Sequence, residues 1–141
     1  MNMRFWITGV VLFVVTMACG FVVHGMVLKA EYEALPNMFR PESEQMQYFP
    51  YMLLGHVVLA FGIAWIYQQG VKPGVSWATQ GIRFGIALSF VTAIPMYLIY
   101  YAVQKMPSGL VGKQIVFDFA CNIIVGLVAA FINKPAPAAA E

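Results

Sequence analysis

The apolar run FWITGVVLFVVTMACGFVVHGMVL, residues 5–28, decides the fold class of this chain. It contains no Asp, Glu, Lys or Arg, and it carries one histidine, His24, near its end. A helix of about 24 residues measures roughly 36 Å, which is enough to cross the hydrocarbon core of a bilayer. The apolar cores of signal peptides span only about 7–15 residues. We therefore expect a retained transmembrane helix over residues 5–29.

The composition of the whole chain supports a membrane protein. Of the 141 residues, 61% are hydrophobic and 10% are charged, whereas soluble domains carry roughly 25% charged residues. So few charges cannot cover a soluble protein of this size, and lipid is therefore the expected solvent for much of the surface. The net charge of +2 and the absence of a basic cluster argue against nucleic acid as a partner.

Three further apolar stretches reach the length of about 17–25 residues that a span requires. They cover residues 50–68, 80–104 and 113–133. Their connections are short, and short connections favour antiparallel neighbours. We predict an all-α, up-down four-helix bundle in the membrane, formed by a single domain of residues 1–134.

Two segments outside the spans have their own signatures. Arg40, Pro41 and Glu42 indicate a helix start, because proline suits the first helical position and acidic residues complement the helix dipole. This start predicts a short interfacial helix in the first loop, which could close over the bundle as a lid. The Pro/Ala-rich tail, residues 135–141, is expected to be disordered.

Small residues and a proline mark the third span. Gly81 and Gly85 form a G-x-x-x-G pattern, which permits close helix packing within a chain or between protomers. Pro95 is expected to kink the helix, because it lacks an N–H and its ring collides with the preceding turn. Cys19 and Cys121 lie at similar depth in the first and fourth spans. A disulfide is geometrically open, but we favour two unpaired cysteines that pack as small hydrophobic side chains.

Polar residues of all four spans lie at similar depth. Measured from the side of the first loop at 1.5 Å per residue, they lie roughly 6–12 Å below the surface. Ionisable residues within a span are costly and therefore form a functional hypothesis. The candidate polar layer consists of His24, His56, Tyr97, Tyr100, Asp118 and Asn122.

Several chemical interpretations of this layer remain open. Two histidines could ligate the iron of haem b, or could hold a divalent metal together with Asp118. The layer could instead form a proton or substrate path, since histidine titrates near neutral pH. The interpretation that we favour is structural, with hydrogen bonds that join the helices. No common catalytic or nucleotide-binding motif is present, and we do not expect an enzyme.

The residues of two regions resemble a group of small bacterial inner-membrane proteins with no assigned activity. The first region comprises His24-Gly25, Tyr32, Phe39-Arg40-Pro41-Glu42 and Met46. The second comprises Gly81-Ile82-Arg83-Phe84-Gly85, Pro95-Met96 and Tyr101-Ala102-Val103. The resemblance covers roughly residues 20–130 and implies a four-span membrane protein without indicating an activity.

These observations together predict a non-catalytic accessory subunit of a larger, energy-transducing membrane complex. The alternatives are a small homo-oligomeric transporter or proton path that uses the polar layer, and a b-type cytochrome. Expected partners are the lipid bilayer and other membrane subunits or further copies of the chain. Lys and Arg divide equally between the two sides, so the positive-inside rule gives no orientation. We place both termini in the cytoplasm of a bacterium.

Overall fold

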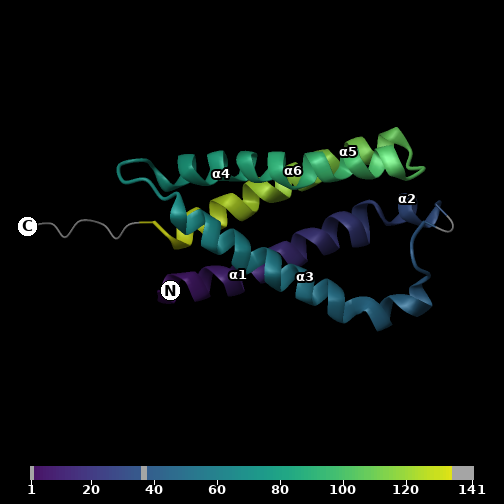
Figure 1. Cartoon of the computed structure of the whole chain (residues 1–141), viewed down its shortest axis with the longest axis horizontal. Coiled ribbons are helices and arrows are strands. Elements are labelled where there is room, and N and C mark those ends of the chain that lie inside the picture. Colours follow the sequence, from purple (N-terminus) through teal and green to yellow (C-terminus); the bar gives the residue numbers. More distant parts are fainter. Residues whose placement is uncertain (1, 36–37, 135–141) are drawn as a thin grey trace, which may run out of the picture.

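The computed structural model describes residues 2–35 and 38–134, and Glu42 by its backbone alone. The regular elements in these ranges are all helical and form the predicted all-α four-helix bundle (Figure 1). The predicted disordered tail, residues 135–141, lies outside the described residues. In chain order the elements are α1 (Met3–Gly20), the π-helix η1 (Phe21–Val27), α2 (Lys29–Glu33), α3 (Glu42–Gln69), α4 (Trp77–Val91), α5 (Ala93–Val103) and α6 (Ser108–Ile132).

Four helical stretches among the described residues are long and apolar enough to cross a membrane. They are formed by α1 with η1, by α3, by α4 with α5, and by α6. Many of their large hydrophobic side chains are exposed, which indicates a lipid-embedded protein because such a surface is unfavourable in water. The stretches are Met3–Val27, Ser43–Gln69, Trp77–Val103 and Ser108–Ile132.

The first connection differs in detail from the sequence prediction. Its short helix is α2, and the helix start expected at Arg40–Glu42 is the start of α3 itself. Pro41 is extended and precedes the first turn of α3. The helix then continues through Pro50, although a proline cannot donate to the carbonyl four residues earlier. The sequence placed the start of the second span at Pro50. In the structure the span begins earlier, at Ser43.

The kink predicted at Pro95 is confirmed as a break between α4 and α5. Thr92 lies between the two helices with φ −118° and ψ −81°, outside the helical region. The break falls where the ring of Pro95 would otherwise meet the carbonyl of Val91. The Thr92 hydroxyl donates to the carbonyl of Leu88 at 2.7 Å and so closes the last turn of α4.

Glycines bring α4 and α6 close together within the chain. A Cβ on Gly81 would lie 2.8 Å from the Cα of Leu127, and one on Gly85 would lie 2.6 Å from the carbonyl oxygen of Asn122. Gly126 of α6 faces the same two glycines. The G-x-x-x-G face is therefore occupied by α6, and it is not free to hold a second protomer.

Two hydrophobic clusters divide the bundle along its length. The cluster near the termini joins α1, α3, α4 and α6 and contains Phe5, Leu12, Ala60, Ile63, Ala64, Tyr67, Leu88, Val125, Ala129 and Ala130. The cluster near the first loop contains Val23, Leu28, Met106, Leu110 and Val111. Helix α3 is buried only in the first cluster, and towards its own start it diverges from the other helices (Figure 1).

Candidate functional site

The π-helix η1 presents the first residue of the site, His24. Its wider turns end in a bond from the Leu28 N–H to the Val23 carbonyl, 2.9 Å long. π-Helical turns are rare and frequently occur at functional sites. The turn places His24 between α2, which follows it in the chain, and α6.

Both ring nitrogens of His24 are bound by neighbouring side chains. Nδ1 lies 2.6 Å from the hydroxyl of Tyr32 in α2. Nε2 lies 3.3 Å from Oδ1 of Asp118 in α6. The imidazole also stacks on the ring of Tyr32, with an interplanar angle of 23°. The ring is thus fixed by one contact on each side.

Two further side chains extend this arrangement. The hydroxyl of Tyr97 in α5 donates to Oδ2 of Asp118, and Nε2 of Gln114 donates to the Tyr32 hydroxyl at 3.1 Å. Gln114 and Asp118 are four residues apart and so lie on one face of α6. We call the five residues His24, Tyr32, Tyr97, Gln114 and Asp118 the His24 network.

The chemistry of these groups fixes the direction of each hydrogen bond. An ionised Asp118 only accepts, so Nε2 of a neutral His24 carries the hydrogen. Nδ1 then accepts from the Tyr32 hydroxyl, whose oxygen accepts from Gln114. Donation therefore runs from Gln114 through Tyr32 and His24 to Asp118, and the Tyr32 hydroxyl and both nitrogens of His24 have partners.

The network can also satisfy a protonated His24. Both ring nitrogens would then donate, and the Tyr32 hydroxyl would need an acceptor. Gln114 is 4% exposed, and its Oε1 has no hydrogen-bond partner among the described residues. Reversing the Gln114 amide places Oε1 against Tyr32 and supplies that acceptor. The site therefore accommodates both charge states of the imidazole.

Tyr32 stays a neutral phenol in this setting. Burial raises the pKa of Tyr32 above its ordinary value of 10.0, and the nearby charges of Asp118 and Glu31 act in the same direction. An ion pair of 2.7 Å between Lys113 and Glu31 holds α2 against α6 at the same end of the bundle. The Tyr32 hydroxyl consequently remains available as a donor.

Asn122 and Tyr100 belong to the predicted layer but not to the His24 network. The Asn122 amide donates to the hydroxyls of Ser89 and Thr92, each at 3.2 Å. It lies one turn from Asp118 along α6 and supports the break between α4 and α5. Tyr100 is 40% exposed and faces outward.

The structure does not bring His56 into the network. Its Nδ1 bonds the carbonyl of Met52, one turn earlier in α3, at 2.9 Å. Its Nε2 lies 3.5 Å from the position that a Cβ on Gly20 would take, so the ring packs against α1. In the described parts of the chain, no group of three or more His, Cys, Asp or Glu is arranged to hold a metal ion.

The predicted lid, Arg40-Pro41-Glu42, lies at the start of α3. Arg40 pairs with Glu44 at 3.5 Å and stacks over the Tyr48 ring at 3.6 Å, so its contacts stabilise the first turns of α3. The side chain of Glu42 lies outside the description. Phe39, directly before this segment, contacts the site, since its ring centroid lies 4.9 Å from that of Tyr32.

Sequence reasoning did not include Tyr32 and Gln114 in the polar layer. Gln114 could have been found, because it is one turn before Asp118 on the same helix face. No comparable spacing on a shared helix face pointed to Tyr32. Its position depends on η1 and on the turn at Leu28, and neither follows from the spacing of residues.

Comparison with known proteins adds no relative. No family model, no curated protein and no solved structure matches the chain. The resemblance to small bacterial inner-membrane proteins therefore stays a prediction.

Proposed function

We propose that this chain is a non-catalytic subunit of a larger, energy-transducing assembly in the bacterial inner membrane, with both termini in the cytoplasm. The observation that carries the proposal is the exposure of the side chains in the first half of α3. Every side chain described from residue 43 to residue 59 is exposed or only half-buried. A membrane helix that leaves its own bundle in this way offers a surface to another helix.

The exposed part of α3 has the character of a helix-packing surface. Tyr51, Leu54 and Val58 share one face by their spacing and are 72%, 61% and 65% exposed. Gly55 and Gly62 have open space where a Cβ would lie, and small residues let another helix approach closely.

A bulky substitution tests this surface. We expect Val58→Trp to prevent co-purification of partner subunits in mild detergent, because the indole would hold a partner helix away from α3. The matched control is Val91→Trp, at a position that is 73% exposed on the third span. Native mass spectrometry of both variants is the measurement. Unchanged partner subunits in Val58→Trp, or no partner in the unsubstituted protein, would count against the proposal.

Proton exchange is a second candidate function, favoured by the His24 network and its ability to satisfy both charge states of His24. If the chain forms a proton path, the purified protein should speed the decay of a pH gradient imposed across liposomes that contain it. Asp118→Asn should then slow the decay, because the amide no longer attracts a proton. A decay equal to that of protein-free liposomes would exclude the path and leave the subunit proposal intact.

A further inference from the structure

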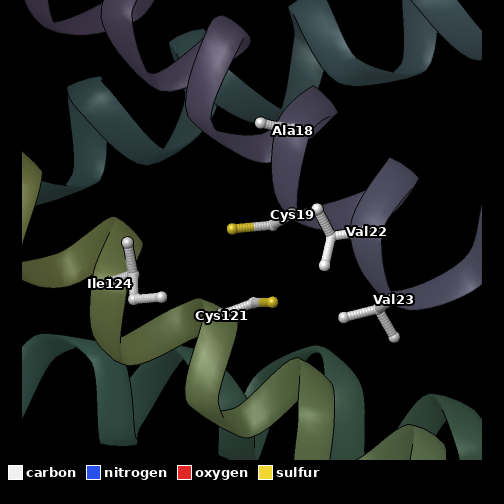
Figure 2. A pocket seen from close by; sticks show the side chains of 6 residues that line it. All are labelled: Ala18, Cys19, Val22, Val23, Cys121 and Ile124. Atoms are coloured by element: carbon white, nitrogen blue, oxygen red, sulfur yellow. The ribbon is translucent and has the colours of Figure 1, made fainter. Parts of the chain in front are cut away.

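A pocket separate from the His24 network lies between the first and fourth spans. It has a volume of ≈ 260 Å³ and is partly open at the surface of the bundle. Its lining consists of Ala18, Cys19, Val22, Val23, Cys121 and Ile124. Figure 2 shows the two cysteine side chains entering the pocket from opposite helices, Cys19 from α1 and Cys121 from α6.

These two residues are the only cysteines of the chain. They are distant in the sequence, and both are free thiols that line the same pocket. Apart from the thiols, the pocket lining is apolar. No third His, Cys, Asp or Glu of the described residues joins them in a metal-binding group. The chemistry that the pair can perform alone is the formation of a disulfide.

We propose that Cys19 and Cys121 are a redox-active dithiol that closes reversibly to an intramolecular disulfide between α1 and α6. The sequence favoured two inert, unpaired cysteines, but the structure places both thiols in one pocket. A disulfide needs an S–S bond of about 2.05 Å and a suitable torsion about it. Closure therefore requires each cysteine side chain to rotate into the open volume of the pocket.

The position of the pocket selects the class of oxidant. Charged thiol reagents of the cytoplasm do not enter hydrocarbon, whereas a quinone dissolves in it and accepts two electrons. In the reaction, both S–H bonds break and one S–S bond forms. The two electrons and two protons pass to the quinone oxygens and give a quinol. A thiol–disulfide couple is a two-electron couple, so the exchange balances with one quinone per protein.

The disulfide would lie directly beside the His24 network. Val23 lines the pocket immediately before His24, and Cys121 follows Asp118 by less than one turn of α6. The cross-link would therefore fix α1 to α6 next to the contact between His24 and Asp118.

The test treats the full-length protein in lipid nanodiscs with duroquinone, a fully substituted benzoquinone that cannot take up a thiol at an unsubstituted ring carbon. We expect both cysteines to lose their reactivity towards a maleimide after denaturation. We also expect the intact mass of the protein to fall by two hydrogen atoms, one quinol to form per chain, and a reducing agent to restore both thiols. The protein should remain a single chain on a non-reducing gel.

Cys19→Ser and Cys121→Ser are the controls, and the remaining thiol of each should stay reactive under the same treatment. The proposal is overturned if the quinone leaves both thiols of the unsubstituted protein reactive. This holds also if a separate treatment with a copper–phenanthroline oxidant does link them. A disulfide between two chains would overturn it equally. Far-UV circular dichroism of each variant checks that it is folded.

Discussion

Replacing Gly85 by alanine is expected to lower the free energy of unfolding by about 3 kcal/mol, the upper range for overpacking a tight interface. The added Cβ would lie 2.6 Å from the carbonyl oxygen of Asn122 and 2.7 Å from the Cα of Ile123. Both are backbone atoms of α6, which no side-chain rotation can move. The helices must therefore separate. Unfolding in mixed detergent and SDS, followed by circular dichroism, measures the change.

The matched control for this substitution is Gly112→Ala. Gly112 is also helical, in α6, but nothing lies within 4 Å of its Cβ position. The free energy of unfolding of Gly112→Ala should equal that of the unsubstituted protein or exceed it by up to about 1 kcal/mol, because alanine is the better helix former. Equal stabilities for the two variants would show that α4 and α6 do not pack as closely as described.

Replacing Asp118 by alanine is expected to cost about 2 kcal/mol of unfolding free energy. The substitution removes the acceptor of both the Tyr97 hydroxyl and the Nε2–H of His24, and an unpaired buried donor costs roughly 1–3 kcal/mol. The Asp118 side chain is 24% exposed, so water partly replaces the lost acceptor and holds the cost near the middle of that range.

The comparison for Asp118→Ala is Glu33→Ala, which also removes a carboxylate side chain. Glu33 pairs with Lys29 at 3.6 Å, but their side chains are 65% and 57% exposed, so the loss should stay below about 0.5 kcal/mol. The same unfolding experiment applies to both variants. A cost for Asp118→Ala no larger than that for Glu33→Ala would mean that the His24 network does not stabilise the bundle.

Depth in the membrane could be predicted from the sequence, because the rise per residue of a helix is constant. Depth placed His24, Tyr97 and Asp118 in one layer, and the structure joins these three. The length of the apolar runs likewise predicted the four helices, and Pro95 predicted the break near Thr92.

The direction of each side chain around its helix could not be predicted in the same way. Helix α3 is apolar on all sides over much of its length, so no stripe of residues marked the face that packs on α1. His56 was therefore assigned to the layer by depth alone, although its ring lies against Gly20. The position of Tyr32 depended on η1, and a π-helical turn has no pattern by which the sequence reveals it.

The π-helix has a consequence for the first span as a whole. Each residue of an α-helix advances about 100° around the axis, whereas the wider turns of η1 advance less and so offset the angular phase of the residues after them. The residues after η1 therefore face directions that an unbroken α-helix would not give them, and His24 makes its contact with Asp118 of α6 from this shifted register. Helix α1 packs on both α3 and α6, and η1 sets which residues in the last turns of the span meet α2 and α6.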